Sequence, residues 1–255
     1  HIPQEILDGG VDADNVAAGV PITIERYPNV AVGDVIQLSW GGVFVLGAPL
    51  TQAQVDGTAP IIVHVSEATI READDSDSVG LSVAFEVYDV VDNRSEDWSV
   101  AQRVVVAIDL SRLEAPILID AQNNVLDVDK LGNADGTAHV WVTASGSFKL
   151  GDTPIIRIKG TPVEGAPVDV EFTGAPLTSV PTTAKIPIPN AVLRPFAKSH
   201  MALSYRLEKA DGSPDLRAKT QFINVIGTIQ RLAAPIALEA VSGALDPALK
   251  QVRVE

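Results

Sequence analysis

One acidic stretch of the sequence is a candidate calcium site. Glu72-Ala73-Asp74-Asp75-Ser76-Asp77 places four carboxylates within six residues. Calcium takes several oxygen ligands, and a short loop can supply them from neighbouring carboxylates. We therefore consider Asp74, Asp75 and Asp77 as candidate calcium ligands. The alternative is a loop that is only solvated, which is the commoner role of an acidic surface turn.

Two acidic pairs elsewhere, Asp12 with Asp14 and Asp127 with Asp129, are weaker candidates for the same ion. None of these stretches follows the twelve-residue spacing of an EF-hand, because the pattern that starts at Asp127 breaks at Leu131. No other cofactor is indicated by the residues.

The residues that catalysis would need are scattered along the chain. The sequence has no cysteine, which excludes disulfides, thiol catalysis and cysteine-ligated metals. It also lacks a nucleophile elbow, a phosphate-binding glycine loop and the zinc motif H-E-x-x-H. We expect no enzymatic activity and no catalytic residues. The four histidines stand far apart, at His1, His64, His139 and His200.

The charge balance excludes two classes of partner. Against 33 Asp and Glu stand 19 Lys and Arg, so the formal net charge is −14. This charge repels the phosphates of nucleic acids and the surface of anionic membranes. No run of about 18 apolar residues is present, so we expect no membrane insertion. The first ten residues lack the pattern of a signal peptide and begin within a repeat, so we expect an export signal elsewhere in a longer protein.

A repeat organises the chain. Residues 112–127 read RLEAPILIDAQNNVLD, and residues 231–246 read RLAAPIALEAVSGALD. The step from Leu126 to Leu245 is 245 − 126 = 119 residues, which is close to a common domain size. Counting back by the same step reaches Leu7-Asp8. The repeat predicts three units: domain 1 at 1–110 with its first strand missing, domain 2 at 111–229, and the opening strands of a third repeat at 230–255.

Each copy is predicted to consist of short strands, because apolar and polar residues alternate between turn residues. About seven such strands in roughly 100 residues indicate an immunoglobulin-like sandwich. The predicted fold class is therefore all-β, with tandem immunoglobulin-like β-sandwich domains and Trp40 in the centre of the first. The strands are expected at 22–25, 35–40, 60–65, 81–88 and 102–108, and again at 115–119, 139–143, 154–159, 168–172, 184–189, 201–208 and 220–226.

A family resemblance rests on two motifs. The segment VGDVIQLSWG at residues 32–41, together with APILIDAQNNVLD and APIALEAVSGALD, resembles the tandem Ig-like repeats of very large bacterial exported and cell-surface proteins. The second copy departs from the motif, since residues 156–160 read IRIKG. The resemblance implies a sandwich that acts as a spacer or adhesive stalk outside the cell, with no catalytic residues.

The linker at residues 109–114 is short and rich in bulky residues, which predicts a stiff junction between neighbouring repeats. Leu110, Leu113, Ile229 and Leu232 are expected to pack there.

The tail at 232–255 has two possible roles. It is expected either to pair with the open edge of another chain, which gives self-association by strand exchange, or to be simply the start of a repeat that was cut.

Two functions remain open from the sequence. The first is a non-enzymatic stalk or fibre repeat of a bacterial surface or secreted adhesin-like protein. The second is an Ig-like module that binds a glycan or a protein. Trp98 and Trp141 are expected in the core or at a junction, and would form a sugar-stacking platform only if they were exposed.

Overall fold

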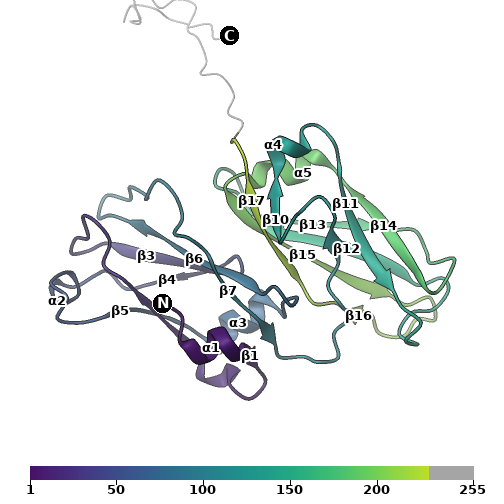
Figure 1. The fold of residues 1–255 in the computed structure, drawn as a ribbon, viewed down its shortest axis with the longest axis horizontal. Helices are drawn as coiled ribbons and strands as arrows, with labels where there is room; N and C mark the ends of the chain where they lie inside the picture. The colour runs from purple at the N-terminus through teal and green to yellow at the C-terminus, as the bar shows by residue number, and fades with distance from the viewer. Residues whose placement is uncertain (230–255) are drawn as a thin grey trace, which may run out of the picture.

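The computed structural model describes residues 1–229, which form two β-rich halves lying side by side (Figure 1). We refer to residues 1–110 as the N-terminal half and to residues 111–229 as the C-terminal half. The strands expected in 230–255, and the strand exchange expected through 232–255, lie outside the described residues.

The N-terminal half contains short helices between eight strands. The helices are α1 (Gln4–Gly9), η1 (Val16–Ala18), α2 (Gln52–Val55) and α3 (Glu67–Ala73). The strands are β1 (Val11–Asp12), β2 (Val20–Ile24), β3 (Val35–Trp40), β4 (Val43–Leu46), β5 (Ile61–Val65), β6 (Leu81–Tyr88), β7 (Gln102–Val104) and β8 (Val106–Ala107).

The C-terminal half repeats most of this order. Its helices are α4 (Val128–Leu131), α5 (Asn190–Leu193) and η2 (Arg194–Phe196). Its strands are β9 (Ile117–Leu118), β10 (Val125–Asp127), β11 (Gly136–Val142), β12 (Thr153–Gly160), β13 (Val168–Thr173), β14 (Thr182–Ile188), β15 (Ser199–Glu208), β16 (Leu216–Arg217) and β17 (Gln221–Ile226).

Each half pairs its strands in the same way. The N-terminal half has a sheet ordered β4-β3-β6-β7, a facing pair β2-β5, and a parallel pair β1-β8. The C-terminal half has a sheet ordered β10-β17-β15-β12-β13, with β16 on β15, and a facing sheet ordered β14-β11-β9. Buried side chains of the facing sheets share one core in each half. The structure therefore confirms the predicted fold class, tandem immunoglobulin-like β-sandwiches in an all-β chain.

The largest side chain of the N-terminal core is Trp40 in β3, which is fully buried as expected. Its counterpart in β12, Ile158, is buried in the other core. The alternation that predicted these strands is visible in their burial, because successive residues of a strand point to opposite faces. The segments predicted at 35–40 and 81–88 coincide with β3 and β6.

The repeat register at the N-terminus differs from the predicted one. Leu7-Asp8 lies in helix α1, whereas Val11-Asp12 pairs with β8 as Leu126-Asp127 pairs with β17. Asp12 accepts hydrogen bonds from the next backbone N–H groups as Asp127 does. The step here is 127 − 12 = 115 residues, and it rises to 152 − 34 = 118 residues at the aspartates that precede β3 and β12, so the register changes between the first strand and β3.

The first two residues lie where the first strand of the sandwich was expected to be missing. The His1 amino group donates to the Thr23 carbonyl oxygen, and the Thr23 N–H donates back to the His1 oxygen over 3.0 Å. Ile117 pairs with His139 at the corresponding place in the C-terminal half. Ile2 is buried, as is Leu118 after Ile117. His1 therefore pairs with Thr23 as Ile117 pairs with His139, although residues 1–3 form no strand.

A buried aspartate starts the same core strand in both halves. Asp34 precedes β3 and accepts from the Ala31 N–H, while Asp152 precedes β12 and accepts from the Lys149 N–H. Each follows a glycine with φ near +90°, a conformation that suits glycine. Asp152 also binds the buried Lys209. Burial alone would raise the pKa of Asp152, but the hydrogen bonds from Lys209 and from backbone N–H groups lower it.

We expect Asp152→Asn to destabilise the C-terminal half strongly, because it leaves the ammonium of Lys209 buried without its counter-charge. The loss expected from breaking a buried ion pair is about 3–5 kcal/mol of unfolding free energy, measured by chemical denaturation. The control is Asp211→Asn, which removes the exposed partner of Lys149 and should leave the transition close to that of the wild type. Equal effects of the two variants would contradict the role assigned to Asp152.

Candidate functional site at the junction of the two halves

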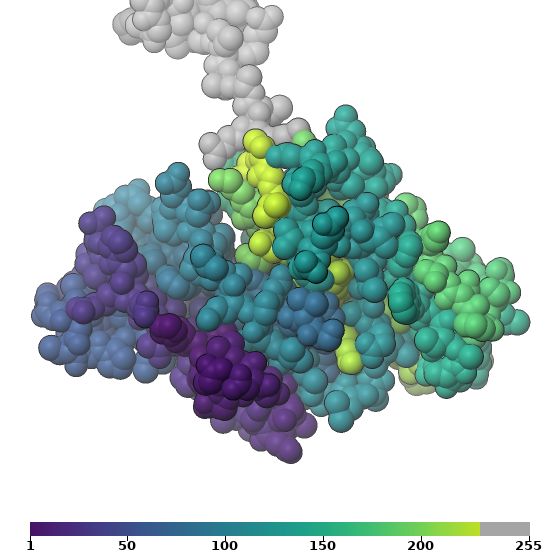
Figure 2. All heavy atoms as spheres, viewed as in Figure 1, coloured from purple at the N-terminus to yellow at the C-terminus, as the bar shows by residue number. Residues whose placement is uncertain are grey.

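Backbone hydrogen bonds run directly from one half to the other. The Thr220 N–H donates to the Asp75 carbonyl oxygen over 2.8 Å, and the Asp77 N–H donates to the Thr220 oxygen over 2.9 Å. Ser76 and Thr220 thereby form a parallel β-bridge. On the face shown in Figure 2, atoms of the two halves touch along this junction. The acidic segment at residues 74–77 is thus part of the joint.

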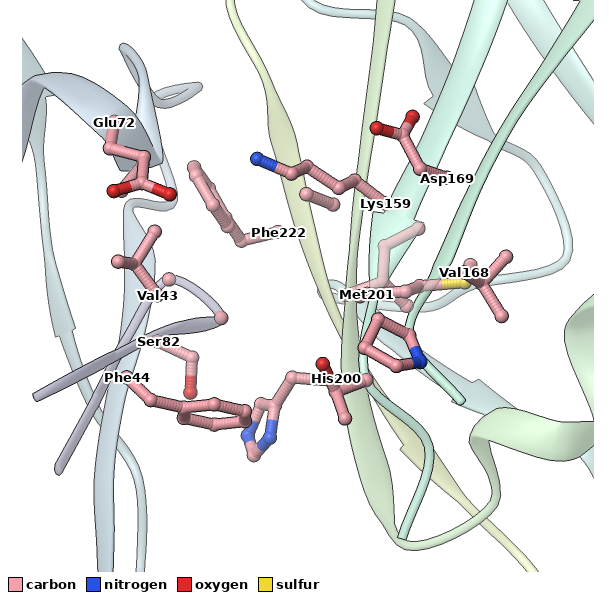
Figure 3. A pocket seen from close by; sticks show the side chains of 18 residues that line it. Val43, Phe44, Glu72, Ser82, Lys159, Val168, Asp169, His200, Met201 and Phe222 are labelled. Carbon is pink, nitrogen blue, oxygen red and sulfur yellow. The ribbon is translucent and has the colours of Figure 1, made fainter. Parts of the chain in front are cut away.

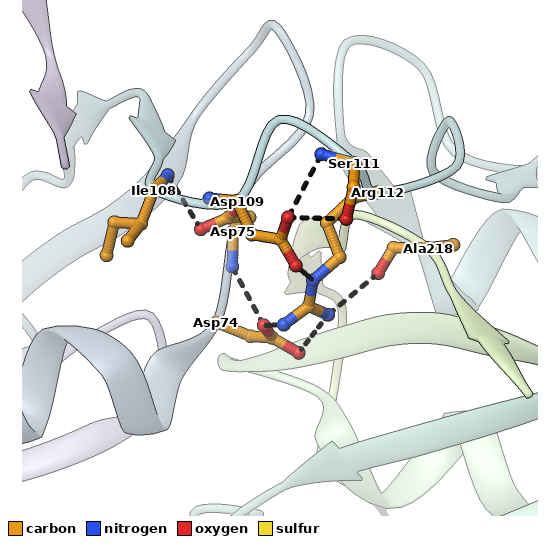
Figure 4. A network of polar contacts seen from close by, with 7 residues as sticks. All are labelled: Asp74, Asp75, Ile108, Asp109, Ser111, Arg112 and Ala218. Atoms are coloured by element: carbon orange, nitrogen blue, oxygen red, sulfur yellow. Dashed lines mark hydrogen bonds and ion pairs between the residues drawn. The ribbon is translucent and has the colours of Figure 1, made fainter. Parts of the chain in front are cut away.

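Arg112 binds both halves and the linker (Figure 4). Its guanidinium group approaches both carboxylate oxygens of Asp74, at 2.6 and 3.2 Å. It also donates to the Asp109 carboxylate over 3.2 Å and to the Ala218 carbonyl oxygen over 3.4 Å. Bidentate contacts between arginine and a carboxylate are among the stronger charge-assisted hydrogen bonds. Arg112 therefore ties the end of α3 to the linker and to the C-terminal half.

The Asp75 carboxylate fixes the start of the linker (Figure 4). It is buried and accepts the backbone N–H groups of Ile108 at 3.0 Å and Asp109 at 2.7 Å. Asp109 in turn accepts from both the N–H and the hydroxyl of Ser111. These contacts hold the linker in one conformation.

Asp77 and Arg103 complete the network on the other side of the bridge. One oxygen of Asp77 accepts the N–H groups of a tight turn, and the other accepts the Asn124 amide over 2.9 Å. Arg103 donates to the carbonyl oxygens of Gly80 at 3.0 Å and Phe222 at 2.8 Å. Burial lowers the pKa of Arg103, and the nearby charge of Asp77 opposes that shift. Both side chains join the N-terminal half to the C-terminal half.

The three candidate calcium ligands, Asp74, Asp75 and Asp77, are adjacent in sequence, but their carboxylates bind different protein groups. Within residues 1–229, no group of three or more histidine, aspartate or glutamate side chains is arranged to hold a metal ion. Asp12 and Asp127 accept backbone N–H groups of their own turns. The calcium hypothesis stays a prediction.

The acidic segment has no counterpart in the C-terminal half. Both α3 and the pair α5–η2 follow a strand of the smaller sheet and lead into the central strand of the larger one. After α3 the chain reads Asp74 to Asp77, whereas after η2 it reads Ala197-Lys198 and enters β15. Asp74 and Lys198 both have positive φ, so the turn is similar while the charge is opposite.

An aromatic side chain provides the apolar part of the joint. Phe222, from β17, is buried in the core of the N-terminal half. Its ring lies over Gly41, where an added Cβ would stand 2.7 Å from a ring carbon. A glycine at this position therefore makes room for the inserted ring.

A cavity of about 430 Å³ lies beside Phe222, between the two halves (Figure 3). Phe44 lines it from β4 and stacks on Trp98 with ring centroids 5.9 Å apart. Trp98 meets the His200 ring edge-on at 6.4 Å. The buried Ser82 hydroxyl and His200 Nε2 have no hydrogen-bond partner within residues 1–229.

The residues predicted at the junction divide into three groups. Leu113 and Ile229 pack against the C-terminal core, and Trp98 lies at the junction. Leu110 is 86% exposed, so the prediction that it packs at the junction is wrong. Trp141 is 63% exposed and therefore lies outside the core, but it lines a groove together with residues 77–79 of the other half. Leu232 lies outside the described residues.

The sequence placed Arg112 in the predicted linker but did not indicate its contact with Asp74, and it did not indicate Arg103 or Phe222 as junction residues. Arg112 and Asp74 are 38 residues apart, and Arg103 and Phe222 are 119 apart, so no local pattern pairs them.

No helix among residues 1–229 is long and apolar enough to cross a membrane.

Comparison with known proteins gives only distant likenesses. No family model matches the chain, and no curated protein matches it. It is similar to a structure of a 1.5-MDa bacterial ice-binding adhesin, with 11% identity and a TM-score of 0.29 over 88% of this chain and 62% of that one. It is also similar to a Ca²⁺-stabilized adhesin with which an Antarctic bacterium binds ice, with 13% identity and a TM-score of 0.30 over 90% of this chain and 48% of that one. A third similar structure holds the FN1–FN3 domains of chicken CNTN1, with 11% identity and a TM-score of 0.24 over 86% of this chain and 62% of that one.

The chain spans less than two thirds of each of these structures. A likeness this distant does not show what this chain does or binds.

We expect acid to weaken the folded state through His200. Burial lowers the pKa of His200 to about 4, and the positive charge of Arg103 adds to the shift. Because the folded state takes up the proton less readily than the unfolded state, stability falls as the pH drops from about 6.5 towards 4. The contribution is up to about 3 kcal/mol.

The measurement is the unfolding free energy of the wild type and of His200→Gln between pH 7 and pH 4. The wild type should lose more stability than the variant over this range, since the variant has no titrating group at this position. Parallel pH profiles would contradict the role of His200.

Proposed function

We propose that this chain is a non-enzymatic spacer, a repeat of a stalk or fibre in a bacterial surface or secreted adhesin-like protein. The observation that carries the proposal is the joint between the two sandwiches, where backbone pairing and the Arg112 network cross from one half to the other. The resemblance of residues 32–41 to tandem Ig-like repeats of bacterial surface proteins also supports it.

The joint resists both bending and twisting. The linker is bonded to both halves. On one side the Asp75 carboxylate accepts its N–H groups at Ile108 and Asp109. On the other, the Leu113 N–H donates to the Arg217 carbonyl oxygen and the Lys219 N–H donates to the Leu113 oxygen. Rotation of one half would also break the charge-assisted bonds of Arg112, which contribute on the order of 1.5–3 kcal/mol each. Two sandwiches held in this way act as one rigid segment. A rigid segment keeps its two ends farther apart than a flexible tether of the same length does.

The partners in this proposal are neighbouring repeats of the same chain. The net charge of −14 makes neighbouring stalks repel one another and keeps the stalk away from anionic surfaces. A location outside the bacterial cell follows from the same role. Binding of a glycan or a protein is the second candidate function, and the exposed Trp141 favours it.

Small-angle X-ray scattering of the full chain tests the spacer. The wild type should scatter as two sandwiches in one fixed arrangement. The double variant Arg103→Ala/Arg112→Ala should scatter as an ensemble with a larger and broader range of dimensions, because the arginine hydrogen bonds and ion pairs across the joint are lost. The control Arg71→Ala removes an exposed ion pair within α3 and should leave the curve unchanged.

Two results would contradict the proposal. The first is a wild-type curve that requires the halves to move independently. The second is a double variant whose curve matches that of the wild type, which would mean that Arg103 and Arg112 do not hold the joint.

We further propose that Asp74, Asp75 and Asp77 serve as anchors of the joint and need no calcium. Their carboxylates already accept hydrogen bonds from Arg112, from linker N–H groups and from Asn124. Titration with calcium should therefore give no heat of binding, and a chelator should leave the melting temperature unchanged. Calcium-dependent stabilisation that Asp75→Asn abolishes would support the ion site instead.

A further inference from the structure

The exposed tryptophan is placed by the pleat of its strand. In β11, Val140 and Val142 point into the core, so Trp141 between them points outwards and is 63% exposed. Ile117 pairs with His139, two residues before Trp141, and is also exposed on this outer face. Large apolar side chains exposed together often mark a binding site.

A groove of about 720 Å³ adjoins this face. Its volume falls within the range of about 300–1,000 Å³ that is usual for small-molecule sites. Its apolar wall includes Trp141, Ile117 and the segment Ala115-Pro116. Short hydroxyl and amide side chains surround that wall, and the exposed ones among them are Ser78, Ser111, Asn123, Thr143 and Ser145.

The charged groups at the groove are paired. Arg112 is bound to Asp74 and Asp109, and Glu114 is 3.2 Å from Lys219. Asp77 accepts from Asn124 and from its own turn. The groups left to meet a ligand are therefore an indole face and neutral donors and acceptors. This combination suits a ligand with an apolar face and a rim of hydroxyl groups.

We propose that this groove, the Trp141 groove, binds a neutral saccharide. The C–H face of a pyranose ring packs on the exposed indole, which removes apolar surface of both from water. The ring hydroxyls exchange hydrogen bonds with the Asn123 amide, donate to the Thr143 hydroxyl and accept from the Ser145 hydroxyl. The Thr143 hydroxyl itself donates to that of Ser145 over 2.9 Å. The site deepens the second candidate function and is independent of the spacer.

The test uses the full chain and the indole N–H signals of its three tryptophans in NMR spectra. The probes are methyl glycosides of glucose, galactose, mannose and their N-acetylated amino sugars, and the corresponding disaccharides. At least one should shift the Trp141 signal saturably. Trp141→Ala should weaken binding at least tenfold, Trp141→Phe should keep part of it, and Asn123→Ala should weaken it several-fold.

The matched control is Leu150→Ala, which removes another exposed apolar side chain of the C-terminal half and should leave the affinity unchanged. The absence of any saturable shift at tens of millimolar sugar would overturn the proposal. So would a shift that persists with equal affinity in Trp141→Ala. The scattering curve reports the spacer separately, so failure of one proposal is distinguishable from failure of the other.

Discussion

The constraint on which the rest of the structure depends is the fixed joint between two sandwiches. A single sandwich of this kind has a closed core, and nothing in its strand pattern requires a particular neighbour. Here the segment at 74–77 pairs its backbone with Thr220 and gives its carboxylates to the linker and to Arg112. The joint is therefore held both by backbone hydrogen bonds and by ion pairs.

Most of the fold could be predicted from local patterns. Alternating residues identified β3 and β6 because burial on one face of a strand leaves a period of two in the sequence. Trp141 was expected in the core or at a junction, but in the structure Val140 and Val142 fill the inner face of β11 and Trp141 between them points outwards. The repeat register at the N-terminus was mispredicted, because the step between equivalent residues of the two halves is 115 at Asp12 and 118 at Asp34, whereas a constant step of 119 residues was assumed.

The joint could not be predicted, because its partners are distant in sequence and share no period. The acidic residues at 74–77 had the composition of a cation site, yet arginine and backbone N–H groups supply their positive partners within the protein. Composition reports which charges are present, and only the fold reports what faces them. The same limit applies to Phe222. Its apolar character predicted a strand, but it did not indicate that the side chain packs in the core of the N-terminal half.

The turn after α3 contains the acidic Asp74, whereas the similar turn of the C-terminal half contains the basic Lys198. Repeats of like sequence fold beside one another on the same chain, and exchange of strands or mispairing of neighbours is their characteristic failure. A docking surface that only one half carries distinguishes the N-terminal half from the C-terminal half. The charge difference at these turns thus makes the two sandwiches, which have similar cores, unequal at equivalent positions of their surfaces.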